Sequence, residues 1–314
     1  MSDTLLGYAL ATSALLLFTA AILLTKGASS RLPLTLGFLV STVVNVLFGS
    51  LAFAVQLALR TEPVPFSLQA FWLFLAAGVF STYLGRWFFY ESVVRFGPAK
   101  ASIFQVSSPI FTALMAWLLL GEQLTLRLAM GMLLAVAGLI LVSYKPGFFS
   151  RTAAPSSPRA PTGRGFGAYI LQSMFLLGLG SSMAYAVGNV VRAAAIRSWN
   201  EPILGALLGA VTGLALHLAF TPGKAGLPAR FKTANRSGIW LYALIGSCTI
   251  CAQIFFIGSM RYIPVAAAAV VTLCTPLLVF PLNHLLFKGA EKLTGAMLIG
   301  SALALVGVMS IVLR

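Results

Sequence analysis

The sequence places one arginine deep inside an apolar, aromatic stretch, where its charge needs an explanation. The stretch GRWFFYESVVRFGP, residues 85–98, contains Arg86. If a helix spans residues 68–94, Arg86 lies about five residues past its middle, roughly 7 Å along the axis. Insertion of an arginine at that depth of a membrane costs at least about 2.5–3.5 kcal/mol. Such a residue usually faces a water-filled cavity, although its long side chain also allows it to extend to the membrane surface.

Helical spacing divides the polar residues of this stretch into two groups. Tyr83, Arg86 and Tyr90 are spaced three and four residues apart and share one face of the helix. Glu91 lies about 140° around the helix from Arg86 but four residues before Arg95, which is a favourable spacing for an ion pair. We therefore interpret Glu91 as a partner of Arg95 at the membrane boundary, with proton coupling as its alternative role.

Arg86 has no acidic partner inside another apolar segment of the sequence. A fixed positive charge in a cavity attracts a carboxylate or a phosphate, and flanking tyrosines add hydrogen bonds and a stacking surface. We therefore predict that Arg86, Tyr83 and Tyr90 bind a substrate. Three polar residues at useful depth in other apolar segments complete the candidate substrate-binding set: Gln105, Asn189 and Gln253.

Two prolines fall near the middles of apolar segments, where proline disturbs a helix. Pro109 and Pro276 are expected to kink their helices and to free backbone carbonyls. In a transporter such breaks line the site or act as hinges, and a kink that serves packing alone is the alternative. Histidine side chains in general titrate near neutral pH, so His284 is the second candidate for proton coupling, although a buried, hydrogen-bonded histidine or one at the membrane interface is the plainer interpretation.

The composition identifies the class of protein. Of 314 residues, 59% are hydrophobic and 9% are charged, whereas a soluble domain has about 45–50% apolar and about 25% charged residues. The net charge of +15 comes from basic residues that sit singly between apolar runs, as in membrane topology signals, so a nucleic-acid partner is excluded. Cys248 and Cys251 form C-x-x-C inside an apolar segment without a second ligand pair, and no metal or cofactor is expected.

The apolar segments predict an all-α polytopic membrane protein. A membrane-spanning helix needs about 20 apolar residues, and ten segments qualify: 5–26, 33–59, 68–94, 98–120, 124–144, 168–192, 202–221, 238–260, 264–287 and 292–313. A linker rich in proline, serine and glycine, residues 145–165, is expected to be flexible. It divides the chain into two five-helix units, residues 1–144 and 166–314.

The two units share ordered sequence matches. RFGPA (95–99) corresponds to RYIPV (261–265), GEQLT (121–125) to GAEKLT (289–294), and the glycine pair Gly131 and Gly138 to Gly300 and Gly307. These matches indicate an internal repeat. Because each unit has an odd number of helices, the second must cross the membrane in the opposite sense. Inverted repeats with a site near the midplane are a transporter architecture.

Both repeats resemble a known family. The pattern RFGPAKASIFQVSSPIFTALMAWLLLGEQLTLRLAMGMLLAVAGLILV is similar to the end of an EamA repeat of the drug/metabolite transporter superfamily, and RYIPVAAAAVVTLCTPLLVFPLNHLLFKGAEKLTGAMLIGSALALVGVM resembles the same unit. The family is built of two five-helix repeats, so the resemblance covers nearly the whole chain. It implies ten transmembrane helices in two inverted EamA-like repeats, with helices five and ten away from a central cavity, where packing or homodimer formation fits them.

These observations favour a secondary transporter that moves a small organic metabolite or drug by alternating access, through a cavity between the repeats that suits anionic or zwitterionic solutes. No Walker A motif is present, so the chain is not expected to use ATP. The alternatives are a structural or scramblase-type membrane protein and a lipid-modifying enzyme. An enzyme needs clustered carboxylates or histidines, whereas the six acidic residues and two histidines are dispersed.

The expected location is the bacterial inner membrane, with the bilayer and a small solute as the partners. The orientation stays open, because two arguments disagree. Lysine and arginine are concentrated in the gaps after odd-numbered helices, which places both termini outside the cytoplasm. Members of the family are usually described with both termini in the cytoplasm.

Overall fold

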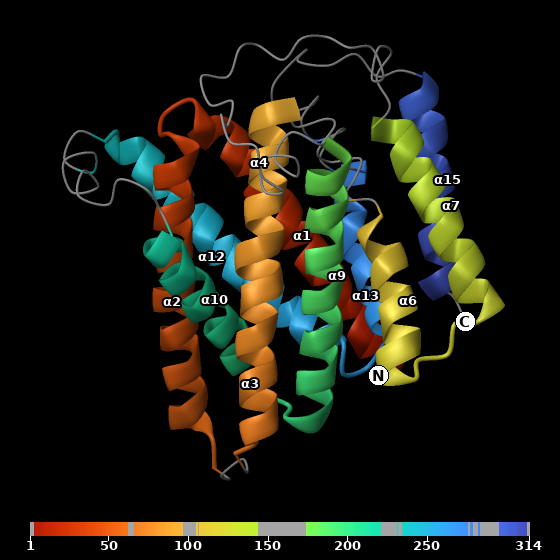
Figure 1. The fold of residues 1–314 in the computed structure, drawn as a ribbon, viewed down its shortest axis with the longest axis horizontal. Coiled ribbons are helices and arrows are strands. Elements are labelled where there is room, and N and C mark those ends of the chain that lie inside the picture. The colour runs from red at the N-terminus through yellow and green to blue at the C-terminus, as the bar shows by residue number, and fades with distance from the viewer. Residues whose placement is uncertain are drawn as a thin grey trace, which may run out of the picture.

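The fold is a bundle of helices that stand side by side (Figure 1). The computed structural model describes residues 3–61, 66–96, 105, 107–143, 174–220, 231, 234–275, 277–278, 282 and 295–312. Within these ranges every regular element is a helix. The linker predicted for residues 145–165 lies outside them, as do Pro276 and His284.

The helices follow the apolar segments of the sequence. The first half of the chain forms α1 (Asp3–Ser29), α2 (Leu34–Leu59), α3 (Leu68–Ala77), the π-helix η1 (Gly78–Gly85), α4 (Arg86–Phe96), α6 (Ser108–Leu120) and α7 (Leu126–Ser143). The second half forms α9 (Met174–Ser198), α10 (Pro202–Phe220), α12 (Arg236–Ser259), α13 (Val265–Leu273) and α15 (Gly295–Val312). The elements α3, η1 and α4 join into one continuous rod (Figure 1).

Five stretches of the described residues are long and apolar enough to cross a membrane: Asp3–Thr25, Leu36–Leu59, Leu68–Phe89, Pro202–Phe220 and Arg236–Ser259. Two shorter apolar helices, Ser108–Leu120 and Leu126–Gly138, accompany them. α1 begins and α15 ends towards the same lower edge of the bundle (Figure 1).

Most of the strong helix contacts join the first half of the chain to the second. α7 packs on α15, α1 on α12 and α13, α2 on α10 and α12, α6 on α9 and α13, and the rod on α9 and α10. Suppose that α1, α2, the rod, α6 and α7 exchange places with α9, α10, α12, α13 and α15, in this order. The pairs α7–α15, α2–α10 and α6–α13 then stay the same, and each of the other pairs becomes another pair of the set. The two halves therefore occupy related places in the bundle, as the ordered sequence matches predict.

The glycines of α7 and α15 allow these two helices to touch along their backbones. A Cβ on Gly138 would lie 2.5 Å from the carbonyl oxygen of Gly300, and a Cβ on Gly307 would lie 2.6 Å from that of Gly131. The contact is thus reciprocal, and it uses the four glycines that the sequence matches pair. These glycine faces meet inside one chain, where small residues permit close helix packing.

A second glycine row, on α10, receives the rod. Gly205 faces the ring of Phe74, and Gly213 faces the side chain of Thr82. Between them, a Cβ on Gly78 would lie only 3.0 Å from the Cα of Gly209. The small residues of α10 thus allow a close helix contact, which holds η1 against the second half of the chain.

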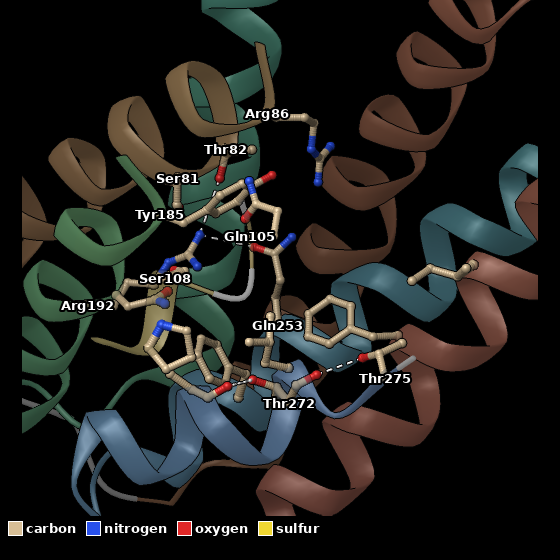
Figure 2. A pocket seen from close by; sticks show the side chains of 17 residues that line it. Ser81, Thr82, Arg86, Gln105, Ser108, Tyr185, Arg192, Gln253, Thr272 and Thr275 are labelled. Carbon is tan, nitrogen blue, oxygen red and sulfur yellow. Dashed lines mark hydrogen bonds between the residues drawn. The ribbon is translucent and has the colours of Figure 1, made fainter. Parts of the chain in front are cut away.

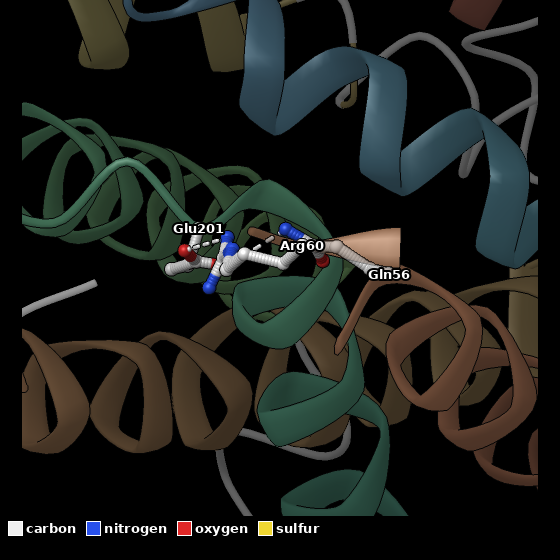
Figure 3. A network of polar contacts seen from close by, with 3 residues as sticks. All are labelled: Gln56, Arg60 and Glu201. Carbon is white, nitrogen blue, oxygen red and sulfur yellow. Dashed lines mark hydrogen bonds and ion pairs between the residues drawn. The ribbon is translucent and has the colours of Figure 1, made fainter. Parts of the chain in front are cut away.

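One end of the bundle is held by carboxylates that join the two halves. Glu201, which is 1% exposed, precedes the first turn of α10 and forms an ion pair of 2.5 Å with Arg60 at the end of α2. The Nε2 atom of Gln56 donates to the same carboxylate at 3.0 Å (Figure 3). A negative charge at the start of a helix is also favoured by the helix dipole. The turn between α9 and α10 is therefore fixed to α2.

A second carboxylate fixes the same end of α9 to the turn between α6 and α7. Glu122 forms an ion pair with Arg197 and accepts a hydrogen bond from the backbone N–H of Val265, in the first turn of α13. Gly121 ends α6 in the left-handed region, with a φ of 64°. The side chain of Thr125 accepts from the N–H of Leu128 at 3.2 Å and so caps α7.

We expect leucine at Gly138 to destabilise the protein, because the new side chain would overlap the backbone of α15. Over-packed sites cost about 1–3 kcal/mol, so Gly138→Leu should lower the thermal unfolding temperature in detergent. The matched control is Gly27→Leu in α1, where an added Cβ meets no atom within 4 Å. Equal unfolding temperatures for the two variants would contradict the close contact of α7 with α15.

The ion pair at Glu201 should respond unequally to loss of either partner. Arg60→Ala leaves a buried carboxylate without its cation, whereas Glu201→Ala leaves an arginine whose side chain is 22% exposed to solvent. We expect Arg60→Ala to cost on the order of 3 kcal/mol and Glu201→Ala to cost less. Chemical unfolding of both single variants and of the double variant measures the free energy of unfolding that each substitution removes. A larger decrease in Glu201→Ala than in Arg60→Ala would show that burial of the unpaired carboxylate does not determine the loss of stability.

Candidate functional site

A cavity of about 270 Å³ lies between the two halves, near the middle of several helices. Its apolar wall includes Phe18 and Ile22 of α1 and Phe256 of α12. The polar lining comes from the rod, α9, α12, α13 and the region at the start of α6: Ser81, Thr82, Arg86, Gln105, Ser108, Tyr185, Asn189, Arg192, Gln253, Thr272 and Thr275 (Figure 2). The cavity is thus built by both halves of the chain.

Arg192 is the most deeply placed charge of this site. It is 5% exposed, and its Nη2 atom donates to Oγ1 of Thr82 and to Oε1 of Gln253, both at 3.3 Å. The two acceptors belong to the rod and to α12, so one guanidinium connects α9 to two other walls of the cavity. A guanidinium has five N–H donors, and these two bonds leave capacity for a ligand.

The sequence interpretation did not include Arg192 among the site residues. The predicted sixth helix, residues 168–192, ends at this arginine, so the sequence indicates a charge at the helix end. α9 instead continues to Ser198, and Arg192 lies almost two turns before its end. A signal was available, because Tyr185, Asn189 and Arg192 follow at i, i+4 and i+7 and form one polar stripe in an apolar helix.

Arg86 brings a second positive charge to the cavity. It is half-buried at the start of α4, and its side chain extends into the cavity (Figure 2). Its Cζ atom lies 4.8 Å from the ring centroid of Phe38 in α2, which is a cation–π contact. The predicted placement of this arginine on a cavity wall agrees with its position in the structure, and its depth is set by the rod.

The π-helix η1 decides which residues of the rod accompany Arg86. In a π-helix the hydrogen bonds run from i to i+5, so residues five apart come onto one face. Ser81, five residues before Arg86, accordingly lines the cavity with it, and Thr82 lines it too. The expected common face of Tyr83 and Arg86 does not hold, because that expectation assumed a regular α-helix. Tyr83 instead lies with its ring centroid 5.9 Å from that of Phe220 in α10.

Gln105 connects the start of α6 to the rod through a serine of α9. Its Nε2 atom donates to Oγ of Ser181 at 2.5 Å, and this hydroxyl donates to the carbonyl oxygen of Gly85 at 2.8 Å. The serine thus joins α9 to the backbone of the rod where η1 ends and α4 begins. The chain of bonds holds the residue before Arg86 in place.

The remaining candidates are distributed as follows. Asn189 and Gln253 line the cavity with Gln105, and Pro109 lines it from the first turn of α6. A kink at Pro109 inside a longer helix stays a prediction, because residues 97–104 lie outside the described ranges. Glu91 is half-buried on α4 and is not among the lining residues that the structure describes. The side chains of Tyr90 and Arg95 lie outside the described part of the chain, as do Pro276 and His284.

The charge of the cavity is of one sign. Among the described residues that line it, Arg86 and Arg192 are the charged ones, and none is Asp, Glu, Lys or His. The groups that contact Arg192 are a hydroxyl and an amide oxygen, which solvate its charge without neutralising it. The arrangement can therefore hold an anionic group by charge-assisted hydrogen bonds.

Comparison with known proteins finds a family that the first part of the chain resembles. Residues 5–144 match the model of the EamA-like transporter family. This part of the chain is therefore similar to the EamA-like transporter family. The match spans α1 to α7 and therefore includes Arg86, Gln105 and Pro109. Members of the family are transporters, and the family together with the apolar helices makes the chain an integral, multi-pass membrane protein.

A solved crystal structure, described only as that of a protein, is similar to this chain with a TM-score of 0.67 and 20% sequence identity. The match covers 98% of this chain and 96% of the chain in that structure. At that identity the likeness shows the fold alone, and it extends over both halves of the chain. None of the curated proteins searched matches the sequence.

Proposed function

We propose that the protein is a secondary transporter that moves a small anionic or zwitterionic organic solute by alternating access. The observation that carries the proposal is the cavity between the two halves, with Arg86 from the first half and Arg192 from the second. Its volume of about 270 Å³ is just below the range of about 300–1,000 Å³ typical of sites for drug-sized ligands. The transported solute is therefore proposed to be a small metabolite.

The transporter is proposed to consist of two inverted five-helix repeats, residues 1–144 and 166–314. The helix contacts support this arrangement, because the set of contacting pairs stays the same when each helix of one half is exchanged with its counterpart in the other half. Repeats related by a two-fold axis make such equivalent contacts. The reciprocal packing of Gly138 on α15 and Gly307 on α7 supports it at atomic detail. The location of both chain ends at one edge of the bundle agrees with an even number of crossings (Figure 1).

Alternating access requires a barrier that opens on one side while the other stays closed. A second cavity, of about 570 Å³, lies at the end of the bundle where Glu122 and Arg197 form their ion pair. Ala267 of α13 lines this second cavity, and Ala269 lines the central one, so the first turns of α13 separate them. We propose that this end is closed in the present conformation and opens when the contact of Glu122 with Arg197 and α13 is released.

The energy source is proposed to be a solute gradient. Among the described lining residues none titrates near neutral pH, which supports exchange or facilitated diffusion over proton coupling inside the cavity. Proton coupling through Glu91 or His284 is the alternative, and flux measured with and without an imposed pH gradient separates the two. Location in the bacterial inner membrane, with efflux as the direction, completes the proposal.

Loss of Arg86 should stop transport. We expect Arg86→Ala to reduce solute flux in proteoliposomes at least ten-fold, because the cavity loses a charge that binds the solute, while expression and membrane insertion stay normal. The solute is chosen beforehand by a thermal-shift screen across amino acids, organic acids, nucleotide precursors and drugs. Arg31→Ala is the matched control, since Arg31 is exposed and donates to Ser237 at 3.4 Å outside the cavity. Normal flux through Arg86→Ala would remove this arginine from the site.

A further inference from the structure

We infer that the central cavity selects small organic dianions and that the protein exchanges them one for one. The inference rests on the proposed transporter function and names the substrate class of the same cavity. It is carried by the juxtaposition of two guanidinium groups, Arg86 and Arg192, in a site whose other described lining residues are neutral.

The two arginines approach each other from different helices. Arg192 of α9 donates to Thr82 at 3.3 Å, and Thr82 lies one helical turn before Arg86 on the same rod. Both guanidinium groups line the same cavity. Tyr185 of α9 lines this cavity with them. The cavity therefore has two cationic groups with a hydrogen-bonding side chain between them (Figure 2).

Neither cation is neutralised by the described protein around it. Arg192 contacts an amide oxygen of Gln253 and a hydroxyl, and Arg86 lies over an aromatic ring. Two carboxylates of the described residues, Glu122 and Glu201, are bound to Arg197 and Arg60 at the end of the bundle. Two charges of the same sign that share one cavity repel each other more strongly where the dielectric is low, and a ligand with two negative charges neutralises both.

The side chains are also held ready for such a ligand. Arg192 is oriented by Thr82 and Gln253, and Arg86 is oriented by the ring of Phe38. Planar guanidinium groups bind carboxylate and phosphate oxygens in pairs. A ligand with one anion leaves one arginine unmatched, and a zwitterion brings its cation into a cavity that is already positive. A dicarboxylate and a phosphate monoester share the required chemistry.

The same charges determine the transport cycle. A carrier that alternates between two sides passes through a state in which the cavity is closed to water on both. Closing an empty cavity removes water from two unneutralised arginines, whereas a bound dianion neutralises them. The loaded carrier therefore changes its side of access much faster than the empty one. Net flux is small, and exchange of one dianion for another is fast.

Matched solutes test the charge rule on the full-length protein in proteoliposomes at pH 7.4. Succinate and its monoamide, succinamate, have similar size but differ by one charge, and glycerol 3-phosphate represents the phosphate monoesters. We expect uptake of a labelled dianion, succinate or glycerol 3-phosphate, to rise at least ten-fold when the vesicles contain the same unlabelled dianion, and not when they contain succinamate. Equal stimulation by succinamate, or equal uptake into empty vesicles, would overturn the inference.

Charge-removing variants test the two arginines. Arg192→Gln and Arg86→Gln each leave one cation, so we expect the preference for succinate over succinamate, or for glycerol 3-phosphate over glycerol, to fall at least ten-fold, while Arg31→Gln retains it. If Arg192→Gln does not fold, as judged by size-exclusion chromatography and unfolding temperature, Arg86→Gln decides. An unchanged preference in a folded variant overturns the inference.

The same assays separate this inference from the proposed function. If a monoanion or a zwitterion is transported and neither dianion is, the transporter stands and the dianion rule fails. If no solute of any class moves through the reconstituted protein, the transporter proposal itself fails. If glycerol 3-phosphate is exchanged and succinate is not, the dianion rule holds and its ligand is a phosphate monoester.

Discussion

Burial of a guanidinium in the middle of a membrane bundle is the constraint on which the arrangement of the cavity depends. Arg192 is 5% exposed, and it lies inside α9, before the last turn of the helix. Such a charge needs polar partners at close range, and they come from two other helices, as Thr82 of the rod and Gln253 of α12. The three helices must therefore keep a fixed distance and rotation, which also fixes the shape of the cavity between them.

The close packing of small residues provides that fixed distance. The glycine row of α10 allows η1 to lie against it, and a Cβ on Gly188 of α9 would come within 3.0 Å of the backbone nitrogen of Ser81. Thr82 is thereby enclosed between α9 and α10, where its hydroxyl meets Arg192. The π-helical hydrogen bonds of η1 change the direction in which successive side chains point, so that Ser81 faces the same cavity as Arg86. Backbone packing and side-chain chemistry are coupled in this short segment.

The related halves supply a symmetrical scaffold with an asymmetrical lining. α1 and α9 hold corresponding places in the bundle, yet α1 contributes Phe18 and Ile22 to the cavity, whereas α9 contributes Tyr185, Asn189 and Arg192. One side of the cavity is therefore apolar and the other polar and positive. The ion pairs of Glu201 and Glu122 with arginines lie at the end of the bundle. The charged residues on the described wall of the central cavity are two arginines. This separation leaves the central charges for a ligand.

The sequence alone was sufficient for the all-helical membrane class of the protein, because apolar length and composition are local properties, and its ordered matches predicted a repeat of the two halves. It also placed Arg86, Gln105, Asn189 and Gln253 at a depth where the structure finds the cavity wall, since depth follows from position along a helix. Only the tertiary structure decided the rest. Arg192 lies on the cavity wall because α9 continues beyond it. Tyr83 lies in the π-helix η1, where the residues face other directions than in an α-helix, and its ring is near Phe220. The partners of Glu122 and Glu201 lie in the other half of the chain, and contacts between distant segments depend on packing that no local pattern specifies.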